Sequence, residues 1–559
     1  MGLRIVSSWA AVVAAVIGVV LVPGGATAES VGRPVRQCAE LKTDFGFPGA
    51  VTHVTKAEIV AADSATGAPE YCDVAGSVEP AVKFELKLPT STYNGRYVQY
   101  GCDGLCGVFR SPAFPAGCGG QPGRDFAVAA TDDGHEGRLP PGTPPDPQLE
   151  VLKIMDGTWA ANNQAARDDY FFRAPHVVSV ASKGIIARFY GQAPRTSYFN
   201  GCSTGGREGL LLAQRYPHDF DGIVAGAPTN FMGPLNGIYF AWLAKTNANP
   251  DGSGILTFDK LPALHSAVLA ACDGLDGLVD GQVDDPRACH FDPLGIQCPA
   301  GVDQASCLTP TQVGVARKLY DGPRDAQGRR LYPGWEAYGS ELAWEGSSVP
   351  TAMGGFTIAF LTDNYLRYVG YPIGKPASSL AEIQFTAAEL NRLTPEGVQG
   401  NALGLDLREF RRAGGKLIMW HGWDDQSIPA VGTVDYYERL AQRNGGLRQT
   451  QEWARLFMVP TKYHCDLGGE RLMNFNPFPN LVDWVERRHA PEQIVATGTS
   501  PEKNPRTRPV FAYPLQARYD GSGSVDDAGN FVPVRPPARS NIIDWVGSYL
   551  YDIPGPVAR

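Results

Sequence analysis

The chain has 559 residues, of which 43% are apolar and 19% are charged, and its formal net charge is -9. These values are ordinary for a folded globular protein and exclude a disordered or fibrous chain. Acidic residues outnumber basic ones by 58 to 49, so no positive excess is available to bind nucleic acid or an anionic membrane. The length fits several domains, or one enzyme core that carries a large insertion.

The first 28 residues have the pattern of a secretory signal peptide. An apolar run extends from about Ala10 to Val22, and Ala26-Thr27-Ala28 precedes Glu29. The run is shorter than the roughly 20 residues of a membrane span and ends in a small-residue cleavage motif. We therefore expect cleavage after Ala28 and release of a secreted protein, with no membrane attachment.

Export would place the 11 cysteines in an oxidising compartment, where disulfides are the default expectation. Three local pairs are reasonable: Cys38 with Cys72, Cys272 with Cys289, and Cys298 with Cys307. Cys102, Cys106 and Cys118 form a cluster that includes the odd cysteine, and their pairing stays open. The spacing of Cys102 and Cys106 also fits half of a zinc site, but no partner pair at zinc spacing lies nearby in the sequence.

A nucleophile motif follows a predicted strand near residue 200. Gly201-Cys202-Ser203-Thr204-Gly205 has the G-x-S-x-G pattern, with a strand-like segment before it and a helical pattern after it. This context is that of a nucleophile elbow in a mainly parallel sheet, where small residues two positions either side of the serine permit a sharp turn. We predict Ser203 as the nucleophile and the Thr204 N–H as an oxyanion donor.

A serine nucleophile needs a base and an orienting acid. After a nucleophile elbow of this kind, these residues are expected along the chain in the order Ser, Asp, His. The loop His421-Gly422-Trp423-Asp424-Asp425 follows a strand-like run. Asp425 is the preferred acid, and Asp424 is its rival. His464 follows the next strand-like run, 456–460, and is the preferred base among nine histidines.

The cysteines beside these residues suggest a further bond. Cys202 precedes Ser203 and Cys465 follows His464. If the serine and the histidine are in contact, their neighbours lie within the Cα separation of a disulfide. A cysteine hydrolase with Cys202 as nucleophile is the less favoured alternative, because export, pairing and the elbow position all favour Ser203.

Together, the Cys-Ser, Asp and His-Cys elements resemble the tannase and feruloyl esterase family. Further segments from about Cys38 to Val532 are similar to family segments in family order, among them 131–135, 220–228, 332–334 and 484–486. The resemblance implies an α/β-hydrolase fold with a large inserted lid domain that carries a calcium loop. Its parts would be a catalytic domain at 29–228 and 416–540, a lid at 229–415, and a C-terminal tail at 541–559.

An acidic loop after residue 272 offers hard oxygen ligands with glycines between them, which suits Ca²⁺ but does not match an EF-hand. Aspartates stand at 273, 276 and 280, and Asp284 stands where an EF-hand needs a bidentate glutamate. The resemblance implies a structural calcium held by the carboxylates of Asp273, Asp276 and Asp280 and by main-chain oxygens of Leu278 and Gln282. A solvated acidic turn is the alternative.

The second oxyanion donor is expected in the loop after the strand at 97–100. Gly101-Cys102-Asp103-Gly104 stands where the family has a glycine-rich run, and we assign the donor to the Cys102 N–H.

The resemblance implies an esterase for small aromatic esters, such as feruloyl or galloyl esters, free or attached to a plant polysaccharide or polyol. Other aromatic esters, including a terephthalate half-ester, are an alternative. A non-catalytic, calcium-dependent binding protein is a weaker one, because Ser203, Asp425 and His464 are all present. Ca²⁺ is the only cofactor expected.

Overall fold

The structure is a computed structural model that describes residues 32–109, 111–115, 125–140, 142–143, 147–351, 357–465, 474–537 and 540–557. The predicted signal peptide, 1–28, and Cys118 lie outside these residues. Within the described residues, no helix combines the length and apolar character needed to cross a membrane.

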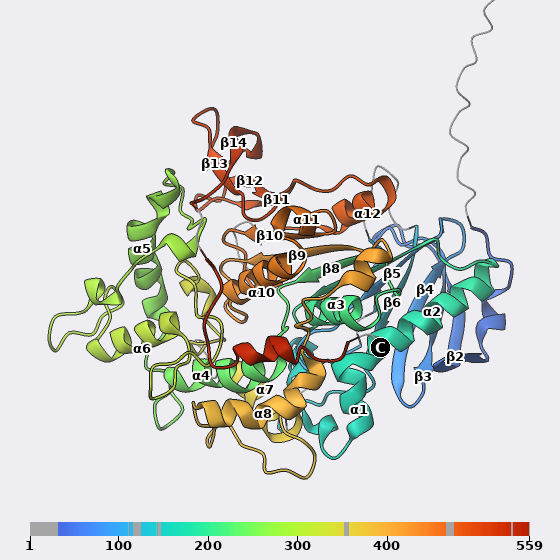
Figure 1. The fold of residues 1–559 in the computed structure, drawn as a ribbon, viewed down its shortest axis with the longest axis horizontal. Helices are drawn as coiled ribbons and strands as arrows, with labels where there is room; N and C mark the ends of the chain where they lie inside the picture. The colour runs from blue at the N-terminus through green and yellow to red at the C-terminus, as the bar shows by residue number, and fades with distance from the viewer. Residues whose placement is uncertain are drawn as a thin grey trace, which may run out of the picture.

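A sheet of ten strands forms the centre of the molecule (Figure 1), in the order β1-β2-β3-β4-β6-β5-β7-β8-β9-β10. The strands from β6 to β10 in this order run parallel, and those from β1 to β4 are antiparallel, as is the β4–β6 pair. The strand bounds are β1 Asp44–Phe47, β2 Ala50–Val60, β3 Tyr71–Val78, β4 Val82–Pro89, β5 Arg96–Tyr100, β6 Phe126–Thr131, β7 Thr196–Cys202, β8 Gly222–Gly226, β9 Lys416–Gly422 and β10 Ala454–Val459. The predicted α/β fold is confirmed.

The parallel strands are buried on both faces, because alternate side chains enter two separate cores. Tyr97 of β5 and Phe199 of β7 enter the larger core with α2 (Ala174–Tyr190), α3 (Thr204–Arg215) and α10 (Ala430–Arg443). Val98 and Tyr198, each one residue further along the chain, enter the smaller core on the opposite face, which α12 (Phe478–Arg487) covers. Helices therefore cover both faces of the sheet.

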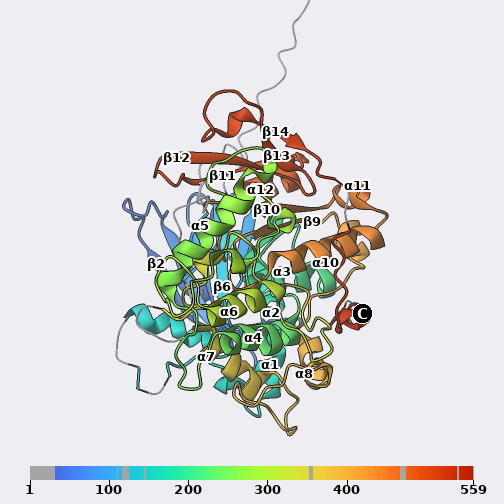
Figure 2. The same ribbon diagram turned by 90° about the vertical axis from the view of Figure 1, so that its left-hand side faces the viewer.

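The interval between β8 and β9 is a helical insertion, and within its described residues only isolated bridges and no named strand occur. Its helices are α4 Phe240–Thr246, α5 Leu261–Cys272, α6 Pro310–Asp321, α7 Thr357–Asn364, α8 Ala387–Gly400 and α9 Arg408–Arg412. Of these, α4, α5 and α6 lie at the opposite end of the molecule from β2 and β3 in Figure 1, and they face the viewer in Figure 2. The remaining short helices are α1 Gln164–Asp168 and α11 Leu447–Thr450.

After α12 the chain forms two antiparallel hairpins, β11 (Gln493–Thr499) with β12 (Pro505–Phe511) and β13 (Gln516–Tyr519) with β14 (Phe531–Val534). The expected C-terminal tail packs on the body of the protein instead of projecting from it. Its Pro554 carbonyl accepts a hydrogen bond from Leu403 N at 3.1 Å, and Tyr551 donates to Asp435 of α10 at 2.7 Å. Gln214 of α3 donates to Pro556, and the Tyr549 hydroxyl bonds that of Thr394 in α8.

Candidate active site

Ser203 occupies a sharp turn between β7 and α3. Its backbone dihedrals are φ 61° and ψ −123°, a region that non-glycine residues rarely adopt. A Cβ on Gly201 would lie 2.3 Å from the carbonyl oxygen of Gly205, and a Cβ on Gly205 would lie 3.1 Å from the Cα of Gly101. The glycines on either side of the serine are thus required by close backbone approach, as a nucleophile elbow demands.

The structure brings Asp425 and His464 together, with His464 Nδ1 donating to Asp425 Oδ2 at 2.7 Å. The same oxygen lies 3.1 Å from His421 Nε2, and Oδ1 accepts the N–H groups of Ser427 and Ile428 at 2.8 Å each. Asp425 is therefore a fixed carboxylate whose Oδ2 contacts both His464 and His421, with the shorter contact to His464. Asp424 is the alternative acid. Among the described residues, which include every partner of His464, it forms no hydrogen bond or ion pair with that histidine.

The two groups shift each other's titration. Burial would raise the pKa of Asp425, but the charges and hydrogen bonds of His464 and His421 hold that pKa well below its usual range. Burial alone would lower the pKa of His464. The charge and hydrogen bond of the Asp425 carboxylate have a larger opposite effect, so the pKa of His464 is raised above its ordinary value. The pair is an ionised acid beside a histidine with strengthened basicity.

Sequence reasoning placed His421 in the acid loop without giving it a role. Its Nδ1 bonds Thr433 Oγ1 at 2.8 Å, and its Nε2 lies 2.9 Å from the Ile428 carbonyl. It thereby fixes the loop that carries Asp425. Only its place in the H-G-x-x-D loop could have signalled this contact.

A disulfide joins Cys202 and Cys465, with their Cα atoms 6.0 Å apart. It ties the residue before Ser203 to the residue after His464. Because the Cys202 sulfur is bonded, Cys202 is not a free thiol nucleophile. Among the described residues Ser203 Oγ forms no hydrogen bond with His464 Nε2, which lies 3.6 Å from Cys465 Sγ. Such a contact is often long in an enzyme without substrate.

The two predicted oxyanion donors differ in availability. Within the described part of the chain the Thr204 N–H has no hydrogen-bond partner, while the Thr204 hydroxyl donates to the Gly104 carbonyl at 2.6 Å. The Cys102 N–H donates to Glu208 Oε2 at 3.2 Å, so the N–H predicted as the second donor is engaged by a carboxylate in this structure. Sequence reasoning missed Glu208, which is 106 residues away.

A cavity of about 740 Å³ opens at the carboxyl ends of β5, β6, β7 and β9. Its lining includes Asp103 and both half-cystines, Cys202 and Cys465, but neither Ser203 nor His464. The cavity therefore reaches the disulfide beside the two residues without containing their side chains.

Glu208 belongs to a buried acidic cluster behind the Cys102 loop. Burial is the main cause that raises the pKa of Glu208 to about 7, and burial together with the Glu208 charge raises the pKa of Asp133 well above its usual value. His135 lies nearby with its ring nitrogens against the carbonyls of Asp133 and Leu105 and its ring stacked on Trp159. Its contacts are those of a structural histidine.

The predicted calcium residues lie on one turn after α5. Asp273 accepts the N–H groups of Asp280 and Gly281, and Asp276 accepts that of Leu278 at 2.9 Å. Gln282 is buried and bonds Asp284.

The sequence placed Asp284 in this loop without predicting it as a ligand, and it gave no sign of the two arginines that lie beside the loop. Burial is the largest cause that raises the pKa of Asp284 to about 8, with the Asp276 charge next. Asp280 Oδ1 is buried and has no hydrogen-bond partner in the described part of the chain, whereas its Oδ2 forms ion pairs with Arg506 and Arg508. Four carboxylates thus converge where two arginines supply part of the positive charge, a donor set that fits a cation with oxygen ligands.

The other described cysteines are also paired. The structure contains Cys38–Cys72, Cys272–Cys289 and Cys298–Cys307, the three local pairs of the prediction. It also joins Cys102 to Cys106, a pairing that the sequence left open.

A parallel sheet of hydrolase type, a serine elbow at the end of β7 and an Asp–His pair beyond β9 and β10 define the architecture of an α/β-hydrolase. The sequence model described as Tannase and feruloyl esterase matches residues 64–364 and 386–534. The chain belongs to this tannase and feruloyl esterase family, and the predicted resemblance is confirmed.

Individual relatives agree with this assignment. The chain is 35% identical to a mono(2-hydroxyethyl) terephthalate hydrolase of Piscinibacter sakaiensis over 89% of its own length and 92% of that protein's. It is 30% identical to a probable feruloyl esterase B-1 of Aspergillus fumigatus, over 83% of this chain and 86% of that one. Among solved structures, feruloyl esterase B from Aspergillus oryzae matches with a TM-score of 0.69 and 26% identity, over 88% of this chain and 98% of that chain.

The long disulfide predicts a stability difference between two cysteine pairs. Cys202–Cys465 spans 263 residues and Cys298–Cys307 spans 9. Loop-closure entropy then gives losses of about 5.5 and about 2.5 kcal/mol of unfolding free energy when each pair is changed to alanine. Urea unfolding of the two double variants measures this. Equal losses would contradict the prediction.

Proposed function

We propose that this carboxylic ester hydrolase cleaves esters of aromatic acids through an acyl-enzyme, with Ser203 as nucleophile, His464 as base and Asp425 as the orienting acid. The observation that carries the proposal is the Asp425–His464 hydrogen bond, 2.7 Å long, clasped to the Ser203 elbow by the Cys202–Cys465 disulfide.

The chemistry follows from these contacts. Asp425 holds the Nδ1 proton of His464, which leaves Nε2 as the site that takes the Ser203 proton while the hydroxyl attacks the ester carbonyl. The imidazolium that forms is stabilised by the buried carboxylate. The Thr204 N–H, at the start of α3, faces the developing oxyanion with the positive end of the helix dipole. His464 then protonates the leaving alcohol, and water releases the acid by the reverse sequence.

The relatives support aromatic acyl groups. The relatives described above include a probable feruloyl esterase and a mono(2-hydroxyethyl) terephthalate hydrolase, and the acids in both names carry an aromatic ring. A feruloyl- or galloyl-type ester is the first candidate substrate, free or attached to a plant polysaccharide or polyol. A terephthalate half-ester is the second, favoured by the 35% identity to the terephthalate enzyme.

The insertion between β8 and β9 would act as the lid over this site. Several of its aromatic side chains are fully buried within it, including Tyr239, Trp344 and Tyr365. These three form its core. Half-buried aromatics such as Trp242 and Trp335 are better candidates for contact with an acyl group.

Two further properties complete the proposal. The protein is secreted after removal of residues 1–28, which agrees with the five disulfides of the described chain.

Ca²⁺ would be held by carboxylates of Asp273, Asp276 and Asp280 and main-chain oxygens of Leu278 and Gln282, where it would neutralise a buried acidic turn. No nucleic acid or membrane partner is expected.

Substituting the nucleophile tests the reaction. In Ser203→Ala, kcat/KM for methyl ferulate, methyl gallate and a nitrophenyl acetate should fall by at least about 10⁴, because the acyl-enzyme cannot form. Initial rates with wild type as reference measure this. Activity that survives the substitution would remove the mechanism.

The raised pKa of His464 predicts the pH dependence. Only the neutral imidazole accepts the serine proton, so kcat/KM should rise with pH through an apparent pKa above 6.5. In Asp425→Asn the raising charge is lost, so the inflection should move to lower pH while the rate drops by about 10⁴. Asp424→Asn is the matched control and should leave the inflection in place. An unmoved inflection in Asp425→Asn would refute the pairing.

Metal removal tests the acidic turn. A calcium chelator should lower the melting temperature by about 2–4 °C, because a ligand bound to the folded state alone stabilises it. Asp276→Asn should make melting insensitive to the chelator. An unchanged melting curve, together with no Ca²⁺ in the purified protein, would overturn the calcium assignment.

A further inference from the structure

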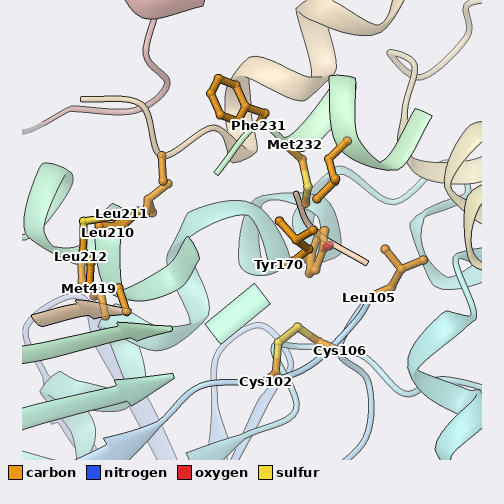
Figure 3. Close-up of a cluster of buried hydrophobic side chains, with 14 of the residues drawn as sticks. Cys102, Leu105, Cys106, Tyr170, Leu210, Leu211, Leu212, Phe231, Met232 and Met419 are labelled. Carbon is orange, nitrogen blue, oxygen red and sulfur yellow. A yellow bond between two sulfur atoms is a disulfide. The ribbon is translucent and has the colours of Figure 1, made fainter. Parts of the chain in front are cut away.

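Two cysteines and two acids from distant parts of the chain meet next to the elbow, outside the residues assigned to catalysis. Cys102 and Cys106 lie in the loop after β5, Asp133 follows β6, and Glu208 is in α3. Figure 3 shows the Cys102–Cys106 bond in the buried interior near Leu105. β5 lies between β6 and β7 in the sheet, so these loops are brought together by the topology itself.

The sulfur-to-oxygen distances in this cluster are close to those of a metal coordination sphere, while the two sulfurs are bonded to each other. Glu208 Oε1 lies 3.1 Å from Cys102 Sγ and 3.9 Å from Cys106 Sγ, and Asp133 Oδ2 lies 3.8 and 3.4 Å from the same sulfurs. A tetrahedral zinc ion with sulfur at about 2.3 Å and oxygen at about 2.0 Å sets neighbouring ligands roughly 3.3–3.8 Å apart. All four ligand atoms lie within 4.8 Å of one another.

The carboxylates of the cluster lack a direct positive partner. Asp133 is 0% exposed and Glu208 3% exposed, and within the described chain neither forms an ion pair. Asp133 Oδ1 is buried with no hydrogen-bond partner. The neighbouring Arg207 directs its Nη atoms to the backbone carbonyls of Phe171 and Tyr170 instead. Without a cation, the raised pKa values of Asp133 and Glu208 keep protons on these buried acids; a bound cation would displace those protons.

We propose that Cys102, Cys106, Asp133 and Glu208 form a buried binding site for a zinc-like divalent cation, which fills when the bond between the two cysteines is reduced. Two thiolates and two carboxylates carry the same total charge as four thiolates, a common structural zinc set. Sequence spacing missed the site because Asp133 and Glu208 lie 27 and 102 residues from Cys106.

Filling the site requires a reductant and proceeds in two steps. A trialkylphosphine attacks one sulfur, the S–S bond breaks, and water supplies an oxygen to phosphorus and a proton to each sulfur, giving phosphine oxide and two thiols. The cation then displaces the two thiol protons. The filled site would brace the loop against the elbow, since Cys102 O accepts the Gly205 N–H at 2.8 Å.

Cobalt absorption tests the site in the full-length protein. Phosphine-treated wild type titrated with Co²⁺ should develop a near-ultraviolet thiolate-to-cobalt band that saturates near one equivalent and is abolished by Zn²⁺. Untreated protein should show no such band, since both sulfurs are bonded. Because the phosphine reduces other disulfides too, the Cys102→Ser/Cys106→Ser variant receives the same treatment and should lose the band.

Variants that keep all cysteines test the carboxylates. Asp133→Asn and Glu208→Gln should each weaken Co²⁺ binding at least about tenfold. Cys298→Ser/Cys307→Ser removes another short-range disulfide, which has no such acidic cluster in the described chain, and should bind as wild type does. The proposal is overturned if reduced wild type gives no band, if the band persists without Cys102 and Cys106, or if neither acid variant binds more weakly. Circular dichroism of each variant verifies folding.

Discussion

The Cys202–Cys465 disulfide joins the end of β7 to the loop after β10, two segments that strand-to-strand hydrogen bonds do not connect directly. β7, which ends at the elbow, and β10, which precedes His464, are separated in the sheet by β8 and β9. The loop after β10 therefore has to reach back across two strand ends. Backbone contacts support this path, since Trp423 N donates to Val459 O at 2.8 Å and Asp424 N donates to Lys462 O at 3.2 Å. The relative position of nucleophile and base depends on that reach.

The buried carboxylates of Asp425, Asp280 and Asp133 differ in the groups that form hydrogen bonds or ion pairs with them. These differences agree with the role proposed for each carboxylate. Asp425 receives four hydrogen bonds and keeps its charge. Asp280 shares one oxygen with two arginines and leaves the other unpaired. One buried oxygen of Asp133 has no hydrogen-bond partner among the residues that the structure describes. The first environment stabilises a fixed anion, and the other two leave capacity for a cation.

The sequence was most informative where chemistry is local. Gly201 and Gly205 identified the turn at Ser203 because close approach excludes side chains there. Chain order selected Asp425 and His464 as candidates, and the structure brings these two side chains into hydrogen-bond contact. Contacts between distant segments carry no spacing signal: nothing in the sequence near Cys102 points to Glu208, which takes the N–H that had been assigned to the oxyanion. Similarly, Arg506 and Arg508 follow the acidic turn by more than 220 residues.

The C-terminal segment 540–557 contacts both the helices beside the central sheet and the insertion between β8 and β9. It contacts α3 and α10 beside the sheet and α8 in the insertion through Gln214, Asp435 and Thr394. This segment follows every strand in the chain, so a ribosome makes it after all ten strands of the central sheet. During synthesis the sheet can therefore assemble before the contacts between residues 540–557 and the insertion form.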